Sequence, residues 1–246
     1  MSFYNGFIGT NPNSNTLFTG GDTKSMFEKN LKIQSNSWYY RNCNLSYIKN
    51  DNGHRCKNIN EIDLDNYILF TGCSHTEGIG LELEKTFPYI VSKKFNCDYY
   101  NLAVAGSGPD VCFFNLLQFY FTTKKLPKFL ILQFPDQARF ITFNNESSSI
   151  SYNFNGIWVD LCKNFIIEGI ELNYFASKNK LYINLIKSLY TCPIISVCPK
   201  TISHEGLEEN KIILSFLDYS RDLSHSGILS HEFAAQQLLE SMRKTR

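Results

Sequence analysis

The chain lacks a large excess of charge of either sign. Its 24 Lys and Arg residues against 23 Asp and Glu residues leave a formal net charge of +1, without a basic stripe. Because nucleic-acid binding normally requires a basic surface, we expect no nucleic-acid partner. The sequence also lacks an apolar run of the roughly 20 residues that span a membrane, and its start lacks the basic and long apolar regions of a secretory signal. We therefore expect a cytoplasmic protein without a membrane partner.

No C-x-x-C pair occurs among the eight cysteines, and several of them, such as Cys112 and Cys198, lie inside apolar segments. A cysteine in such a place acts as a small hydrophobe, and scattered thiols favour a reduced, intracellular chain over a disulfide framework. Cys43, His54 and Cys56 could be drawn as three metal ligands, but their spacing matches no common zinc pattern and a clear fourth ligand is lacking. The sequence therefore predicts no metal site.

The sequence has ample material for a hydrophobic core, with 43% apolar residues. From residue 66 onward, short apolar runs alternate with longer segments of helical character. Apolar runs of roughly four to six residues are typical of strands buried on both faces of a parallel sheet, so we predict an α/β fold. The predicted strands are residues 67–71, 99–103, 129–134, 194–198 and, more weakly, 212–217. The predicted helices are residues 85–95, 109–122, 173–190 and 228–243.

A chain of 246 residues predicts one large domain, or one domain with a small appendage. Residues 1–20 are rich in Asn, Gly, Thr and Ser without a period, which favours an extended or poorly ordered arm. Residues 21–65 are polar with aromatic islands, and we predict that they form an appendage on the following domain, residues 66–246. Within that domain, residues 140–165 are turn-rich and interrupt the alternation, so we interpret them as an insertion.

The segment Gly72-Cys-Ser74-His-Thr-Glu-Gly78 lies between a predicted strand and a helix-like segment. A serine at such a turn presents its hydroxyl at the edge of the sheet. Its own backbone N–H lies at the positive end of the helix dipole, where an oxyanion is stabilised. Thr76 stands where the α/β-hydrolase elbow needs its second glycine, and no Gly-Lys-Ser/Thr of a P-loop follows. The ordinary structural role of such a serine is that of a helix N-cap.

Two later segments can face the same crevice, because loops at the carboxyl ends of parallel strands build the sites of open α/β sheets. Asn101-Leu-Ala-Val-Ala-Gly106 follows the second predicted strand, and its glycine can turn a backbone N–H toward the serine. Asp222-Leu-Ser-His225 precedes the last predicted helix. Serine, histidine and aspartate supply a nucleophile, a base and an orienting carboxylate. Taken singly, the glycine could be a plain strand-to-helix turn and the Asp-x-x-His an incidental surface turn.

The three segments together resemble the first, second and fifth sequence blocks of the SGNH (GDSL-type) hydrolase family, over about residues 66–242. The resemblance implies a three-layer α/β/α sandwich with a five-stranded parallel sheet, an SGNH/flavodoxin-like fold. It also implies that Ser74 is the nucleophile, His225 the base and Asp222 the residue that orients the base. The backbone N–H groups of Ser74 and Gly106 would form part of the oxyanion hole.

The sequence departs from this family at the third block, where Gly-x-Asn-Asp is expected. Here the third strand runs into Phe134-Pro-Asp136-Gln137-Ala-Arg139, so a carboxylate stands in place of the Asn amide. An ionised carboxylate only accepts hydrogen bonds and would repel an oxyanion. We hypothesise that the Gln137 amide, one residue displaced, replaces the missing donor; the alternatives are an oxyanion hole with two donors or a different substrate. Asp136 and Arg139 are candidate substrate contacts. The thiol of Cys73, where the family has Asp, predicts a weaker hydrogen-bonded support of the serine turn.

Two further features match family patterns. His231 resembles the frequent histidine at the start of the family's last helix, and Asn50-Asp-Asn-Gly53-His-Arg55 resembles an N-x-x-G-x-R segment upstream of the serine block. Arg55 could bind a polar or anionic substrate group, or it could tie the appendage to the core. The second role is slightly favoured.

These patterns predict a serine hydrolase that cleaves a carboxylic ester, such as an O-acyl group on a carbohydrate, without a metal or an organic cofactor. The expected partner is a small-molecule or glycan ester, and the sequence indicates no oligomeric state. Two alternatives stay open. The irregular third block favours a binding or assembly protein of the same fold, for example a viral or phage component associated with a virion. The same residues could also transfer an acyl group to an acceptor.

Overall fold

The computed structural model describes residues 2–135, 172–199, 207 and 210–245. Its centre is a five-stranded sheet in which every pairing is parallel, with the strand order β6-β5-β7-β8-β9. Counted along the chain within this sheet, the order is 2-1-3-4-5, which is that of flavodoxin-like doubly wound folds. The strands are β5 (Tyr67–Thr71), β6 (Asp98–Asn101), β7 (Phe129–Leu132), β8 (Ile194–Pro199) and β9 (Lys211–Leu214).

The central strands β5 and β7 form where the sequence has continuous apolar runs. Every residue of β5 and of β7 is buried, because helices cover both faces of the sheet. Successive side chains of a strand point to opposite faces. Leu69 and Leu130 therefore pack in the core on one face, whereas Phe70 and Ile131 pack in the core on the other. Burial on both faces explains why these strands show no alternation of polar and apolar residues.

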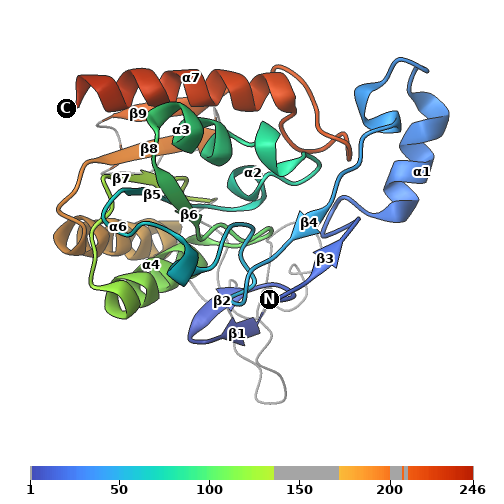
Figure 1. The fold of residues 1–246 in the computed structure, drawn as a ribbon. Coiled ribbons are helices and arrows are strands. Elements are labelled where there is room, and N and C mark those ends of the chain that lie inside the picture. The colour runs from blue at the N-terminus through green and yellow to red at the C-terminus, as the bar shows by residue number, and fades with distance from the viewer. Residues whose placement is uncertain (1, 136–171, 200–206, 208–209, 246) are drawn as a thin grey trace.

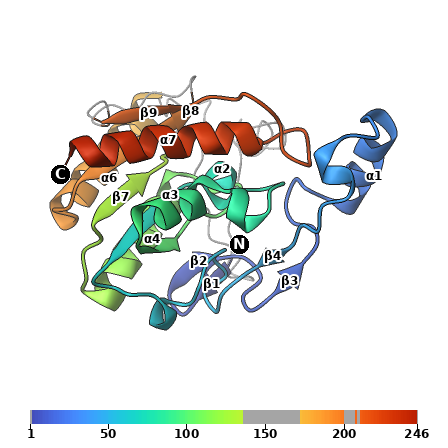
Figure 2. The ribbon, with the colours of Figure 1, turned by 45° about the horizontal axis from the view of Figure 1, so that its top comes forward.

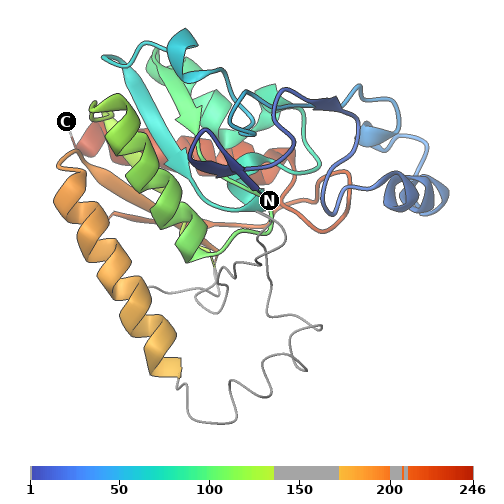
Figure 3. The same cartoon turned by 90° about the horizontal axis from the view of Figure 1, so that it is seen from below.

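Helices form a layer on each face, which makes the fold a three-layer α/β/α sandwich (Figure 1). On one face, α3 (Phe87–Phe95) and α7 (Ile228–Lys244) pack against each other (Figure 2). On the other face, α4 (Pro109–Thr123) and α6 (Leu172–Leu189) lie side by side, as Figure 3 shows. The predicted fold class and sheet are confirmed, and the four predicted helices are present with ends within about two residues.

The N-terminal part contains short strands and one helix. β1 (Ser2–Tyr4) and β2 (Phe7–Gly9) form an antiparallel hairpin, and β3 (Asn15–Thr16) pairs with β4 (Tyr47–Ile48). α1 (Lys24–Ile33) begins after Thr23, whose hydroxyl accepts the N–H of Met26 at 3.1 Å. Two short 3₁₀ helices complete this part, η1 (Tyr39–Arg41) and η2 (Ile59–Glu61).

Residues 2–20 are folded onto the domain, although their composition predicts an extended or poorly ordered arm. Phe7 and Ile8 are buried. The N–H of Ile8 donates to Asn115 Oδ1 of α4 at 2.8 Å, and its carbonyl accepts from Asn115 Nδ2 at 2.8 Å. Composition does not predict this contact, because the contact depends on two apolar residues in a polar segment and on one distant asparagine.

Some predictions fall outside the described residues. They concern the insertion at residues 140–165 and the side chains of Asp136, Gln137 and Arg139. In the part of the chain that the structure describes, no helix has both the length and the apolar content to cross a membrane.

Candidate active site

Ser74 lies at the turn between β5 and α2 (Ser74–Glu77), where the sequence predicted a strand-to-helix turn. The serine opens a helix at the carboxyl edge of the sheet and is buried. Gly72 is required by close packing, because an added Cβ would lie 2.4 Å from Thr76 Oγ1 and 2.6 Å from Gln133 Oε1. Any larger residue there would have to move the turn itself.

Gln133, which follows β7, holds the serine turn in place. Its Oε1 accepts hydrogen bonds from the Cys73 N–H at 3.2 Å and from the Thr76 hydroxyl at 2.5 Å. Its Nε2 donates to the Cys73 sulfur at 3.4 Å. The Cys73 sulfur thus accepts a hydrogen bond from the side-chain amide of Gln133, at the end of the neighbouring strand. The sequence reasoning did not identify Gln133; the available signal was one amide inside the apolar run 129–134.

The loop after β6 is tied directly to the serine turn. The Gly72 carbonyl accepts hydrogen bonds from the Val104 N–H at 3.2 Å and from the Ser107 hydroxyl at 3.1 Å. Gly106, between these two, has a φ of 76°, which glycine adopts without strain. Within the described residues, the backbone N–H groups of Ser74 and Gly106 make no hydrogen bond. Neither donor thus has an acceptor among the described residues, and the resemblance implies a role in the oxyanion hole for both.

Asp222 and His225 meet in the loop before α7. His225 Nδ1 lies 2.5 Å from Asp222 Oδ2, and Asp222 Oδ1 accepts hydrogen bonds from the backbone N–H groups of Ser224 and His225 at 2.9 and 3.0 Å. The Ser220 hydroxyl donates to the same Oδ1 at 2.8 Å. Because the carboxylate only accepts, the imidazole carries its proton on Nδ1 and keeps Nε2 as its basic nitrogen. The Asp222 side chain is buried, whereas that of His225 is 19% exposed.

The electrostatics keep Asp222 ionised. Burial by itself would raise the pKa of this carboxyl group. The hydrogen bond and the charge of His225, together with the N–H groups of Ser224 and His225, outweigh burial and lower the pKa of Asp222 to about 2. The group beside His225 is therefore a carboxylate across the neutral and mildly acidic range.

His75 and Ser226 connect the serine turn to the loop of His225. Ser226 Oγ lies 3.1 Å from His75 Nδ1 and 3.0 Å from His231 Nε2, and the ring centroids of His75 and His225 are 5.2 Å apart. The Phe87 N–H donates to His231 Nδ1 at 3.0 Å, so His231 carries its proton on Nε2 and donates to Ser226. Burial lowers the pKa of His231 to about 3, and electrostatic interactions with His75, Arg55 and His225 act in the same direction. His231 is thus a neutral support of the site.

Ser74 and His225, for which the resemblance implies the roles of nucleophile and base, lie on neighbouring segments of the chain fold. Among the described residues, no hydrogen bond joins Ser74 Oγ to the His225 ring. Hydrogen bonds between catalytic groups are often long in the absence of substrate and tighten when it binds. The two loops are held together by the backbone, since the Arg221 N–H donates to the Gly80 carbonyl at 3.1 Å.

Arg55 is buried and bound to backbone carbonyls. Its guanidinium donates to Gly78 at 2.6 Å, to Leu81 at 2.7 Å and to Ser46 at 3.0 Å. These contacts join the N-terminal part to the segment that follows α2. They favour the tying role of Arg55 over a substrate contact, because its donors are turned inward.

A buried ion pair makes a second connection. Lys49 Nζ binds Glu77 Oε1, and the other oxygen of Glu77 accepts the Ala105 N–H at 2.5 Å. Glu77 ends α2, and Ala105 directly precedes Gly106, so this pair links the N-terminal part to both the serine turn and the loop after β6. The sequence reasoning missed it, because one lysine and one glutamate form no motif.

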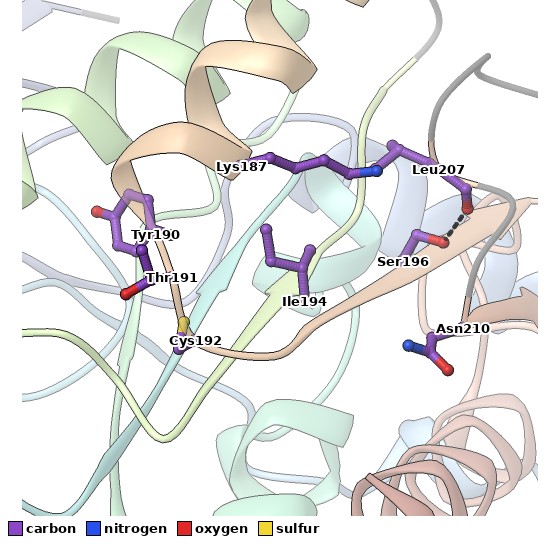
Figure 4. A pocket seen from close by; sticks show the side chains of 8 residues that line it. All are labelled: Lys187, Tyr190, Thr191, Cys192, Ile194, Ser196, Leu207 and Asn210. Atoms are coloured by element: carbon purple, nitrogen blue, oxygen red, sulfur yellow. Dashed lines mark hydrogen bonds between the residues drawn. The ribbon is translucent and has the colours of Figure 1, made fainter.

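Apart from this site, the described residues form a cavity but no group of side chains that could hold a metal ion. Within the described residues, no cluster of three His, Cys, Asp or Glu side chains could hold a metal ion. A cavity of about 310 Å³ lies where β8 begins, at the opposite end of the strands from Ser74 (Figure 4). Its lining residues are Lys187, Tyr190, Thr191, Cys192, Ile194, Ser196, Leu207 and Asn210.

Comparison with known proteins gives similarity in structure only. No family model matches the chain, and neither does any curated protein. Similar solved structures include a carbohydrate esterase family 2 enzyme from Corynascus thermopiles (Myceliophthora fergusii), with 11% identity, 73% of this chain and 66% of that chain covered, and a TM-score of 0.47. The esterase EstA from Pseudoalteromonas sp. has 10% identity, 73% and 98% coverage, and a TM-score of 0.47. A lipolytic G-D-S-L family protein from Veillonella parvula has 12% identity, 71% and 96% coverage, and a TM-score of 0.41.

The chain spans slightly less than two thirds of the length of that carbohydrate esterase. At these identities and TM-scores, the similarities assign no residue and no activity. The functional assignment below therefore rests on the geometry of this chain's own side chains.

Proposed function

We propose that the chain is a serine hydrolase of the SGNH type that cleaves a carboxylic ester through an acyl-enzyme on Ser74. The observation that supports this most directly is the 2.5 Å contact between His225 Nδ1 and the buried, ionised Asp222. That contact leaves a basic Nε2 on a loop that packs beside the turn of Ser74. A helix N-cap or an incidental surface turn would need neither the buried carboxylate nor the fixed tautomer.

The proposed reaction uses these groups in a fixed order. Ser74 Oγ attacks the carbonyl carbon while its proton moves to His225 Nε2, and Asp222 stabilises the imidazolium that forms. The N–H groups of Ser74 and Gly106 donate hydrogen bonds to the carbonyl oxygen and stabilise the negative charge that develops on it. When the tetrahedral intermediate collapses, the C–O bond to the alcohol breaks and His225 protonates the leaving oxygen. A water molecule then attacks the acyl-enzyme, gives its proton to His225 and releases the acid and Ser74.

The proposed substrate is a small-molecule or glycan ester, including an O-acylated carbohydrate. Two N–H donors come from Ser74 and Gly106, and we assign a third donor to the amide of Gln137, since this chain has no Asn in the family's third block. The exposed edge of His225 marks the side from which the ester would enter.

The test combines labelling with turnover of short-chain acyl esters and acetylated sugars. A fluorophosphonate should modify Ser74, and mass spectrometry of the labelled peptide identifies the residue. Ser74→Ala should abolish labelling and turnover with an unchanged melting temperature. His225→Ala should reduce turnover by about 10³-fold or more, as for members of a cooperating triad.

The matched control is Ser92→Ala, a buried serine of α3 whose hydroxyl donates to the Tyr89 carbonyl within the same helix. It should keep labelling and turnover. Labelling of a residue other than Ser74, or full turnover by the Ser74→Ala protein, would contradict the proposal and favour a binding protein of the same fold.

A further inference from the structure

The residue that precedes Asp222 is anchored in the N-terminal part of the chain. Arg221 donates from Nε to Asp22 Oδ1 at 3.0 Å and from Nη2 to Asp22 Oδ2 at 2.7 Å, which makes two parallel hydrogen bonds. The exposed fractions of the two side chains are 4% and 0%. A buried, two-point contact between guanidinium and carboxylate fixes both distance and orientation.

The surroundings of this ion pair make it rigid. Tyr47 donates its hydroxyl to Asp22 Oδ2, and the same hydroxyl oxygen accepts the Gly80 N–H at 2.8 Å. The Arg221 carbonyl accepts Asn30 Nδ2 at 3.0 Å. The Arg221 guanidinium also lies over the rings of Phe18 and Phe27, with 4.8 and 5.2 Å to their centroids. The segment between β3 and α1, together with α1, thus supplies the groups that contact Arg221, and β4 supplies Tyr47, which holds Asp22.

The same segment lies against the catalytic pair itself. A Cβ added at Gly21 would stand 3.5 Å from Asp222 Oδ2 and 3.6 Å from His225 Cε1. The backbone beside Asp22 therefore covers one side of the hydrogen bond between these two residues. Figure 1 shows the loop before α7 reaching toward α1, away from the body of the sandwich. Side chains of the N-terminal part support the loop at that end, and the Gly80 carbonyl accepts the Arg221 N–H.

We propose that Asp22 is a positioning residue for the reaction: through Arg221 it holds Asp222 and His225 in register with the serine turn. This inference rests on the proposed function. The first 65 residues are then part of the catalytic unit, because they supply a wall and an anchor of the acid–base loop. The physical reason is that a displacement of about 1 Å in a catalytic group costs on the order of 10²-fold in rate.

The test uses Asp22→Asn in the full chain, with Asp22→Glu as the conservative variant that keeps the carboxylate. Asp22→Asn keeps the size of the side chain and removes the charge that Arg221 binds. We expect kcat per folded molecule to fall by about 10- to 10²-fold, with KM changed by less than about threefold. Labelling of Ser74 should slow in parallel, and Asp22→Glu should recover a large part of both rates.

A spectroscopic measurement reports the position without turnover. The proton between His225 Nδ1 and Asp222 should give a far-downfield proton NMR signal in the wild-type protein, assigned by its loss in His225→Ala. In Asp22→Asn this signal should broaden or move upfield, because the two residues are no longer held at their short distance.

The control for general destabilisation is Met242→Ala, a buried change near the end of α7. It should lower the melting temperature while leaving kcat and the downfield signal unchanged at a temperature where the protein is folded. Tyr47→Phe, which removes a single hydroxyl from the network, provides a milder variant if Asp22→Asn does not fold. It should reduce kcat several-fold and broaden the same signal.

The outcomes separate the two proposals. If the wild-type protein shows no labelling of Ser74 and no turnover, the proposed function is wrong, while the NMR signal still tests the position of the pair. If the wild-type protein is active but the Asp22 and Tyr47 variants keep kcat and the signal, Asp22 has only a structural role and the inference is overturned.

Discussion

Two buried histidines should make the folded protein sensitive to mild acid. His54 Nε2 lies 3.1 Å from the Ile8 carbonyl, and His54 Nδ1 lies 3.2 Å from the Tyr100 hydroxyl. His231 is held by Phe87 and Ser226, as described above. Burial lowers the pKa of His54 to about 3 and that of His231 to about 3. Both rings are therefore neutral in the folded state at pH 5, where an unfolded histidine is protonated.

The sign of the effect follows from proton binding. The unfolded chain titrates these histidines at about 6.5, so it binds more protons than the folded chain between pH 6.5 and pH 3. Their contribution to stability is complete above pH 6.5 and is lost as the pH falls toward 3. At pH 5 the loss is about 2 kcal/mol for each histidine, or about 4 kcal/mol for both. This is a large fraction of the roughly 5–15 kcal/mol that stabilises a typical domain.

The assay is urea unfolding at pH 8, 7, 6 and 5, followed by tryptophan fluorescence. His231→Gln should flatten the pH dependence by about 2 kcal/mol between pH 8 and pH 5, whatever its stability at pH 8. Met242→Ala should lower the whole curve without changing its slope. The reasoning would be refuted if wild-type stability were constant from pH 8 to pH 5, or if His231→Gln kept the wild-type slope.

Two shorter predictions concern the serine turn and the third block. Gly72→Ala should cut turnover by more than about 10²-fold and lower the melting temperature, because the added Cβ would displace Thr76 and Gln133. An active variant with an unchanged melting temperature would show that the turn is packed less tightly than described. Gln137→Ala should reduce kcat by about 10²–10³-fold, as does the loss of one oxyanion donor, with little change in melting temperature. Asp136→Asn should keep or raise activity. An unchanged kcat in Gln137→Ala would remove that residue from the proposed oxyanion hole.

The local pattern of this sequence was enough to predict an α/β fold with a parallel sheet, whereas the three-layer sandwich was predicted from the family resemblance. The central strands β5 and β7 are short apolar runs, and α4 and α7 begin at Pro109 and Ile228, where their starts were predicted. Such features are local, because burial on both faces and helical periodicity leave their signature in neighbouring residues. The positions of Ser74, Gly106, Asp222 and His225 at strand ends or before a helix were predictable for the same reason.

The support of the site was decided only by the tertiary structure. Asp22 and Arg221 are 199 residues apart in sequence, and Gln133 and Cys73 are 60 apart. Single polar residues of this kind carry no periodicity, so the sequence does not show which of its many polar side chains will meet. The fold selects them, because a buried charge or amide must find a partner where water is excluded. The sequence alone thus determined the strands, the helices and the places of the candidate site residues in this protein, whereas long-range packing determined which side chains of the N-terminal part contact them.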